Sequence, residues 1–383
     1  MTNNVIPARI TEARETRAMS MGDLAQEIGV SRQSISKYEN GISGPSPETL
    51  NAISVRLDFP LDFFYKAGQD NSASNTPLFF RSKASIAKKV QTACAYQVKW
   101  MNEVKTQLET YVDFVQVDVP TIDEGYENLT LEDVEELALS VRKDWGLGEE
   151  PIGDLIGVLE NRGILVSEFS PNDSCDFKGI DAFSCWKDGT PYILYHPVQK
   201  SAVRTRFSIL HELGHLIMHS FIPETDALTK RVADFADEQA DRFAAAFLLP
   251  STPSSFPRDI RSTSLYSLES VKRKWGAAMS TIIKRCETLD LLTESQISYL
   301  KRQMTMKKYW RKEPLDDILT IESPEVIRDA IYLLIDSHIL TKAAFIRSCA
   351  LSIRDLKHLC GLPEEFFSDY VERRKPMLRL IKP

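Results

Sequence analysis

The sequence predicts an α+β fold that is mainly helical, and three observations lead to this prediction. Apolar residues recur at spacings of three and four along most of the chain, which is typical of helices with one buried face. Strand-like stretches are confined to residues 164–166, 179–186 and 192–195, and a Lys-Asp-Gly-Thr turn separates the last two. A length of 383 residues is too great for one ordinary core, so we expect several domains.

The composition limits the class of protein. The chain is 43% hydrophobic and 26% charged, which is typical of globular proteins and excludes a disordered or fibrous chain. No apolar run approaches the roughly 18 residues of a membrane span, and residues 1–10 lack the apolar block of a signal peptide, so we expect a cytoplasmic protein without membrane contact. The six cysteines are scattered without a CxxC pair, which argues against a disulfide framework. A net charge of −7 means that any DNA site must be local.

Residues 1–66 are predicted to form a bundle of five short helices. Residues 21–28 have the spacing of a short helix, Gly29 allows a tight turn, and the Ser31 hydroxyl can cap a second helix. Two short helices joined in this way can place the second one in the major groove of DNA. The outward side chains of the second helix that would reach base edges and phosphates are Arg32, Gln33, Ser34, Ser36 and Lys37.

This segment resembles the lambda-repressor-like (XRE-type) helix-turn-helix family. The resemblance rests on Leu24-Ala25, Gly29-Val30-Ser31, Ile35-Ser36, Tyr38-Glu39-Asn40-Gly41, Pro45, Pro47, Leu50 and Leu61-Asp62-Phe63-Phe64. It implies that the partner is a double-stranded DNA operator, and repressors with a helix-turn-helix domain of this type commonly bind as homodimers. A helical bundle used for protein contacts remains the alternative, because residues 1–60 hold six basic and seven acidic side chains.

Residues 67–128 are predicted to be a helical linker. One long helical stretch extends from about residue 82 to 115, and Val119-Pro120 ends it. Between residues 76 and 105, six basic side chains face one acidic side chain, a local charge of +5. A solvated helix face explains such a run, and contact with the DNA backbone is the sharper alternative.

Residues 129–255 contain the strongest chemical motif, His211-Glu212-Leu213-Gly214-His215. At about 100° per residue, His211 and His215 lie about 40° apart on one helix face, so both imidazoles can bind one Zn²⁺ ion. Glu212 lies about 100° round the helix, where it can hold the attacking water as the catalytic base. A buried helix whose histidines are satisfied by other residues is the alternative. Gly214 argues against it, because glycine inside a helix costs about 1 kcal/mol relative to alanine.

A catalytic zinc site needs a third protein ligand. The following helix, expected over 231–249, has an apolar stripe centred on Ala240. Asp237 lies about 60° from this centre and Glu238 about 160°, so we favour Asp237 and keep Glu238 as the alternative. Asp241 could accept the second N–H of a ligand histidine and thereby orient the ring, although a solvated carboxylate is equally compatible with the pattern.

Two stretches resemble the ImmA/IrrE-type metallopeptidases: residues 204–219, around the HExxH motif, and residues 237–250, Asp-Glu-Gln-Ala-Asp-Arg-Phe-Ala-Ala-Ala-Phe-Leu-Leu-Pro. The resemblance implies a zincin-like domain with a small sheet, and it assigns the third zinc ligand to Asp237, at a position where the family usually has Glu. A strand beside the cleft can hold an extended substrate by backbone pairing. The candidate strand contains Gly179, Ile180, Asp181, Ala182 and Phe183.

The expected function is therefore a DNA-binding transcription regulator with a zinc-dependent endopeptidase domain. The resemblance implies cleavage of a helix-turn-helix repressor, often in a stress response, and the alternative substrate is the chain's own linker. The first competing hypothesis is a regulator whose peptidase-like domain senses a ligand without proteolysis. The second is an antitoxin-like partner protein that docks through the helical C-terminal domain at 256–383, where Val326, Ala330, Leu333 and Leu334 recur at helical spacing.

Overall fold

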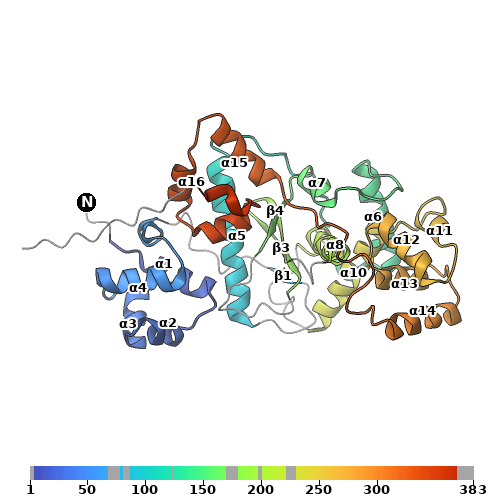
Figure 1. The fold of residues 1–383 in the computed structure, drawn as a ribbon, viewed down its shortest axis with the longest axis horizontal. Helices are drawn as coiled ribbons and strands as arrows, with labels where there is room; N and C mark the ends of the chain where they lie inside the picture. The colour runs from blue at the N-terminus through green and yellow to red at the C-terminus, as the bar shows by residue number, and fades with distance from the viewer. Residues whose placement is uncertain are drawn as a thin grey trace, which may run out of the picture.

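The computed structural model describes residues 4–67, 78–80, 87–122, 125–169, 180–196, 201–220 and 230–368. Helices dominate this part of the chain and one small sheet accompanies them, so the predicted α+β, mainly helical class is confirmed. Figure 1 shows an elongated molecule with the N-terminal helices at one end and residues 256–306 at the other. The sheet lies between them, near the middle of the long axis.

The N-terminal unit contains the five short helices that the sequence predicts. They are α1 (Pro7–Thr16), α2 (Met21–Ile28), α3 (Arg32–Glu39), α4 (Pro47–Leu57) and the 3₁₀ helix η1 (Leu61–Tyr65). Gly29 joins α2 to α3 with a left-handed backbone, φ +72°, which glycine adopts without strain. The Ser31 hydroxyl accepts the Ser34 N–H and so caps α3. Leu24 and Ile35 are fully buried, and they fasten α2 and α3 to the core of the unit.

Helix α5 (Lys88–Leu108) is shorter than the stretch expected over 82–115, and it is part of a core. Its buried Lys99 and Trp100 both reach Glu12 of α1, at 2.9 Å and 2.7 Å. The basic run is therefore not one continuous solvated face, because Lys99 is buried in an ion pair while Lys88 and Lys89 are exposed. Two further residues of the basic run, Arg81 and Lys83, lie outside the described residues.

The sheet has four strands in the order β1-β3-β4-β2. The three predicted strands are present as β2 (Leu165–Glu168), β3 (Ala182–Lys187) and β4 (Thr190–Tyr195). Strands β3 and β4 form an antiparallel hairpin, and β2 is parallel to β4. The sequence did not predict β1 (Phe79–Phe80), which pairs antiparallel with the outer edge of β3.

Two hydrophobic cores meet at this sheet, one on each face. Phe183 and Leu194 belong to the core that contains α5 and the N-terminal unit. Ala182 and Ile193 belong to the second core, because successive side chains of a strand point to opposite faces. The second core is built around helices α6 (Leu131–Asp144), α7 (Leu155–Glu160), α8 (Ala202–Met218) and α10 (Lys230–Leu248).

The C-terminal helices are divided between the two cores. The helices α11 (Phe256–Asp259), α12 (Leu265–Trp275), α13 (Met279–Thr288) and α14 (Glu294–Met306) extend the second core. The chain then returns, and α15 (Val326–Asp336), α16 (Lys342–Cys349), α17 (Ile353–Leu359) and the 3₁₀ helix η5 (Glu364–Phe367) pack in the first core. The domain limits expected at 66, 128 and 255 remain predictions, and the cores group the segments differently.

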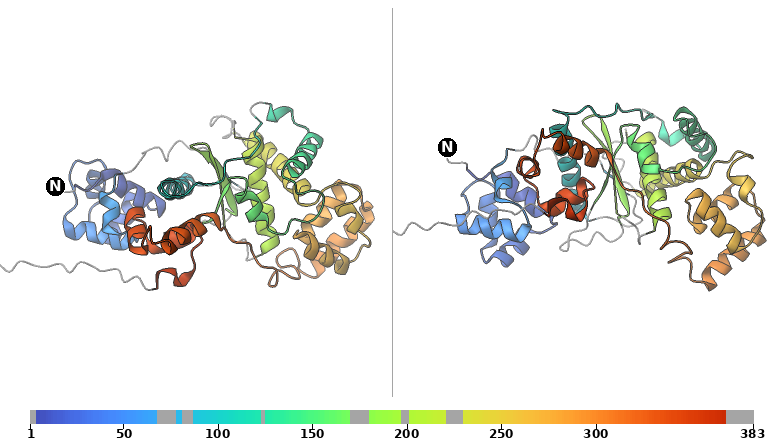
Figure 2. Two further views of the ribbon diagram at one scale, coloured as in Figure 1. Left: turned by 90° about the horizontal axis from the view of Figure 1, so that it is seen from above. Right: turned by 45° about the horizontal axis from the view of Figure 1, so that its top comes forward.

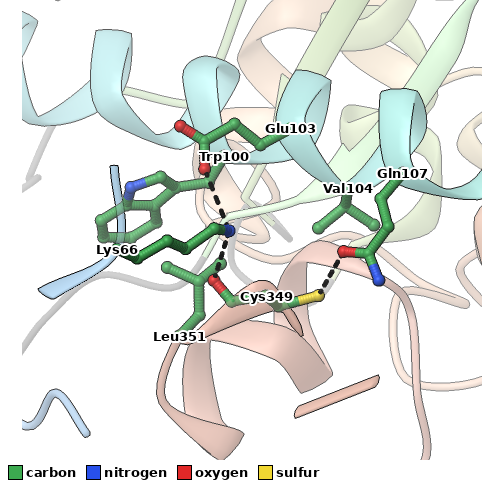
Figure 3. Close-up of a pocket in the computed structure, with 7 residues that line it drawn as sticks. All are labelled: Lys66, Trp100, Glu103, Val104, Gln107, Cys349 and Leu351. Carbon is green, nitrogen blue, oxygen red and sulfur yellow. Dashed lines mark hydrogen bonds and ion pairs between the residues drawn. The ribbon is translucent and has the colours of Figure 1, made fainter. Parts of the chain in front are cut away.

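The N-terminal unit is joined to the returning helices by polar contacts. Arg17 forms a double hydrogen bond with Asp355 of α17, at 2.7 Å and 3.1 Å. Lys66 lies between α5 and the end of α16, where its Nζ donates to the Cys349 carbonyl at 3.1 Å and faces Glu103 at 3.7 Å (Figure 3). Figure 2 shows the returning helices beside the N-terminal unit, with α5 between this unit and the sheet.

Two expectations from composition concern membrane spans and cysteines. None of the described helices is long and apolar enough to cross a membrane. The five cysteines within the described ranges are all free and buried.

Candidate metal centre and DNA-contacting helix

The HExxH motif lies on α8, a helix that is buried along almost its whole length. Gly214 permits a close approach to α10, because a Cβ at this position would stand 3.2 Å from the Ala240 Cα and 3.4 Å from Phe243. A larger side chain would push the two helices apart. The glycine therefore determines how near the acidic residues of α10 come to the two histidines.

Three potential ligand atoms converge between α8 and α10. The Nε2 atoms of His211 and His215 are 3.0 Å apart. The Asp237 Oδ1 lies 3.5 Å from the His215 Nε2 and 3.8 Å from the His211 Nε2. A tetrahedral zinc ion with bonds of about 2.0–2.1 Å separates its ligand atoms by about 3.3 Å. The donor set and its spacing thus fit Zn²⁺, with one position left for water or substrate.

The two candidates for the third ligand differ in position. Asp237 belongs to the one cluster of three metal-binding side chains found among the described residues, together with His211 and His215. Glu238 is exposed and is not part of this cluster. About a third of the Asp237 side chain (35%) is exposed, so the donor set has access to solvent on this side.

Asp241 orients His211. Its Oδ1 lies 2.9 Å from the His211 Nδ1. A carboxylate accepts hydrogen bonds, so this contact places the ring proton on Nδ1 and leaves a lone pair on Nε2, where the metal would bind. This arrangement is the one considered for Asp241 from the sequence.

A second chain of hydrogen bonds, which the sequence did not predict, orients His215. Its Nδ1 lies 2.9 Å from the Nδ1 of His219, whose Nε2 lies 2.9 Å from the Gln239 Oε1. The Gln239 amide nitrogen donates to the carbonyls of Tyr126 and Leu129. Because this amide nitrogen donates, the Gln239 oxygen accepts, and the direction of every bond in the chain follows. His215 therefore donates through Nδ1 and presents the lone pair of Nε2 to the metal position.

The electrostatic state of the cluster suits a divalent cation. Burial lowers the pKa of His215 to about 4 and the pKa of His219 to about 3, so both rings are neutral at pH 7. Burial alone would raise the pKa of Asp237, but the proximity of the His211 and His215 rings outweighs burial and holds the pKa well below its usual range. Two neutral imidazoles and one carboxylate form a donor set that zinc binds.

Glu212 lies next to the cluster and is fully buried. Its Oε2 accepts the Ser184 hydroxyl of β3 at 2.7 Å. Ser184 thereby links the middle of β3 to the carboxylate that the sequence assigns as the base. The sequence contains no local signal for this contact, because the two residues come together only when the sheet packs on α8.

The residues expected to form the substrate strand are only partly in a strand. Ala182 and Phe183 begin β3, while Ile180 and Asp181 lie just before it, and Gly179 lies outside the described residues. Strand β3 is not a free edge at its start, because β1 pairs with residues 183 and 184. Phe183 is a fully buried core residue.

Three further polar side chains that could stabilise an oxyanion, Tyr192, Tyr195 and His219, make other contacts. The hydroxyl of Tyr192 reaches the Asn102 Oδ1 at 2.8 Å, and that of Tyr195 reaches the Glu322 carbonyl at 3.2 Å. Tyr192 belongs to the first core, on the sheet face away from α8. Tyr195 belongs to the second core, and its hydroxyl is taken up by the contact with residue 322. His219 lies behind His215, as described above.

The predicted DNA-contacting residues share helix α3. Arg32, Gln33 and Lys37 are exposed, and Ser34 and Ser36 are half-buried. A buried ion pair between Arg14 and Glu39 holds the end of α3 against α1. In Figure 1, α2 and α3 form the lower border of the N-terminal unit, away from the returning C-terminal helices. The outer face of α3 is therefore open to a large partner.

Comparisons with known proteins match two separate segments of the chain. Residues 10–64 match the family model described as helix-turn-helix. Residues 162–287 match the model of a peptidase family described as IrrE N-terminal-like domain. The second match begins inside the domain expected over 129–255 and continues into α13.

Curated relatives are similar to the N-terminal part. A protein of Methanospirillum hungatei, described as an HTH-type transcriptional regulatory protein, is 41% identical over 59 residues, which are 15% of this chain and 18% of that protein. A protein of Methanoregula boonei with the same description is 54% identical over 55 residues, 14% of this chain and 16% of that protein. The chain thus spans less than a fifth of the length of these relatives.

A Bacillus subtilis protein, the HTH-type transcriptional repressor RghR, is 27% identical over 107 residues. The match covers 27% of this chain and 79% of that repressor. The chain therefore combines a segment of the helix-turn-helix family at residues 10–64 with an IrrE N-terminal-like domain at residues 162–287.

Proposed function

We propose that this protein is a DNA-binding transcription regulator whose IrrE N-terminal-like domain is a zinc-dependent endopeptidase. The observation that carries the proposal is the convergence of His211, His215 and Asp237 on one point, with Glu212 beside it. Each imidazole is oriented by a hydrogen bond that it donates through Nδ1, His211 to Asp241 and His215 to His219. A helix stabilised only by packing has no need of both orienting contacts.

Glu212 is the proposed catalytic base. Bound zinc would supply a Lewis acid that polarises a peptide carbonyl and makes water more acidic. Glu212 would accept the proton of the attacking water and deliver it to the leaving amine nitrogen. The hydroxyl of Ser184 holds one oxygen of this carboxylate at 2.7 Å and so limits its rotation.

DNA recognition is assigned to α3. Arg32 can form a double hydrogen bond with guanine or contact a phosphate, and Gln33 can form one with adenine. Lys37 and the hydroxyls of Ser34 and Ser36 are placed along the same helix. A homodimer that contacts two half-sites is the expected assembly, since operators of this kind of reader are commonly palindromic.

Two substrates are compatible with this arrangement. One is a separate helix-turn-helix repressor, which would be cut near the shared DNA site. The other is the chain itself, between the N-terminal unit and residue 128. Either cut would convert a binding event into an irreversible change in transcription, as in a stress response.

Metal content and cleavage test the proposal together. Wild-type protein should purify with about one zinc per chain. Asp237→Ala should lose most of the zinc, while Glu238→Ala, the matched control on the exposed face, should keep it. With zinc, wild-type protein should produce fragments of itself or of a repressor, and Glu212→Gln should produce none. Zinc-free wild-type protein, or equal fragments from both proteins, would contradict the proposal.

A ligand-sensing regulator without proteolysis remains the second candidate. The observation in its favour is the attachment of the N-terminal unit, here called the DNA reader, to helices that also pack on the sheet. The attachment is made by Glu12, Arg17 and Lys66. Through these contacts, a displacement of the sheet caused by a ligand would move α3 without cleavage of the chain. Zinc binding with no cleavage under any condition would favour this candidate.

The antitoxin-like partner hypothesis gains little from the C-terminal helices. The apolar stripe of α15 is mostly core, because Leu334 is buried and Val326 and Ala330 are packed against the first core. Leu333 is the exposed member of this set, at 57%. A single exposed leucine is ordinary for a protein surface.

A further inference from the structure

Strand β1 occupies an unusual place in the sheet. It spans Phe79–Phe80, between the N-terminal unit and α5 in the chain, and it lies along the outer edge of β3 (Figure 1). The pairing is antiparallel, with Phe79 opposite Ser184 and Phe80 opposite Phe183. Strand β1 also contacts α8, the helix of the HExxH motif. Strand β1 thus forms one edge of the sheet and also contacts the helix that contains His211 and His215.

The residue opposite Phe79, Ser184, shows that this edge of β3 lies near the proposed base Glu212. Ser184 donates its hydroxyl to Glu212, so the backbone of β1 passes the part of β3 that contacts the proposed base. An extended peptide binds an exposed sheet edge by adding a strand, with main-chain hydrogen bonds supplying the affinity. This edge of β3 is where such a peptide would pass the candidate site.

We propose that residues 78–80 occupy the strand position of an extended peptide substrate, and that they act as an intramolecular competitor for it. The proposal rests on the proposed peptidase function for the meaning of "substrate", but the occupancy of the edge can be tested without any cleavage. The partner it implies is a polypeptide in an extended conformation, recognised mainly through its backbone.

The contact is short enough to be exchanged. Strand β1 pairs with two residues of β3, whereas β3 has six residues, from Ala182 to Lys187. A longer incoming strand could form more main-chain hydrogen bonds with the same edge. Each hydrogen bond adds a small net stabilisation, so a few additional pairs would favour the incoming strand.

Displacement of β1 would not require the reader to unfold. Helix α1 is attached to α5 through the buried contacts of Glu12 with Lys99 and Trp100, which do not involve the sheet. Lys66 is held separately by the Cys349 carbonyl. Exchange at the β3 edge would therefore release residues 78–80 while the N-terminal unit stays folded.

The test uses the full chain in a Glu212→Gln background, so that a bound peptide is not cut. Two double variants remove the pairing of β1: Phe79→Pro/Phe80→Pro and Phe79→Gly/Phe80→Gly, the second in case proline disturbs folding. The control is Val115→Gly/Val117→Gly, which changes two exposed apolar residues of the segment after α5. The probe is a fluorescent peptide with the sequence of residues 75–84, followed by anisotropy.

The peptide should bind both β1 variants at least about tenfold more tightly than the parent and the control, because their edge is already open. Hydrogen exchange at residues 182–187 should accelerate in the variants and slow again when the peptide is added. Equal peptide affinity for parent and variants, or unchanged exchange in β3, would overturn the proposal. Neither readout depends on zinc or on cleavage, so an inactive wild-type protein would refute the peptidase and leave this inference to be decided by binding.

Discussion

Single side chains carry most of the chemistry proposed for this protein. Asp241 is an example, because it touches no reacting atom and yet determines which nitrogen of His211 faces the metal position. His219 and Gln239 have the same effect on His215. A search of the sequence for ligands alone finds the HExxH motif and misses two of these three orienting residues.

Replacing Asp241 with alanine should weaken zinc binding by about 10- to 100-fold, since His211 would lose the contact that holds its ring. Competition with a chromogenic chelator measures the affinity. Lys284→Ala is the matched control, because Lys284 lies 3.7 Å from the other Asp241 oxygen, is largely exposed and does not contact the histidines. Equal zinc affinity in Asp241→Ala and wild type would show that the hydrogen bond has no role in metal binding.

Gln33 is expected to read a base. A DNA site can be selected from a random-sequence library with wild-type protein and then used to compare variants. Gln33→Ala should weaken binding to this site by about 1–3 kcal/mol and relax the base preference at one position. Gln26→Ala, on the exposed face of α2, is the control. If the base preference is the same with and without Gln33, this residue does not make the contact assigned to it.

At the scale of elements, one buried carboxylate connects the second core to the returning helices. Glu160, at the end of α7, accepts the backbone N–H groups of Glu325 and Val326 at the start of α15. Burial raises the pKa of Glu160 to about 7, although these two hydrogen bonds oppose the shift. The folded protein therefore binds a proton that the unfolded chain releases at a lower pH.

This shift predicts a pH dependence with a definite sign. Between the unfolded pKa near 4.5 and the folded pKa of about 7, the folded state binds more protons, so the contribution of Glu160 to the free energy of unfolding falls as the pH rises. The loss should be about 2–3 kcal/mol by pH 8. Glu160→Gln, which keeps an acceptor oxygen, should remove this part of the dependence. Urea unfolding at pH 5 and pH 8 measures the change in the free energy of unfolding between these pH values. An equal change in wild type and Glu160→Gln would contradict the assignment.

Three strands of the sheet could be predicted from the sequence and the fourth could not. Strands β2, β3 and β4 have the β-branched and aromatic composition that predicts them, and the Asp188-Gly189 turn predicts the hairpin. Strand β1 has no such signal, since a pair of phenylalanines is equally compatible with a helix. Its pairing depends on a β3 edge that lies about a hundred residues away.

At the scale of the whole molecule, the reader is a fixed part of the structure. Asp355 of α17 receives a double hydrogen bond from Arg17, and both side chains are largely buried. Asp355→Ala would leave a partly buried guanidinium without this partner. The expected loss is about 2 kcal/mol of unfolding free energy, with faster hydrogen exchange in α17.

The matched control for this change is Glu27→Ala. Glu27 pairs with Arg56 within the N-terminal unit, but both side chains are more than a third exposed, so its removal should cost less than about 1 kcal/mol. If the two variants unfold at the same denaturant concentration, the contact with α17 does not hold the reader in place.

The sequence by itself determined the class of fold, the order of its parts and the two motifs, because helical periodicity, capping serines and an i, i+4 histidine pair are local properties. It also favoured Asp237 over Glu238, since the angle around a helix follows from spacing alone. Tertiary structure decided the rest: the contact of Ser184 with Glu212, the chain from His215 to Gln239, the division of the C-terminal helices and the place of β1. Each of these depends on tertiary packing, because α8 packs against the sheet and α10, and β1 pairs with a strand about a hundred residues later in the chain.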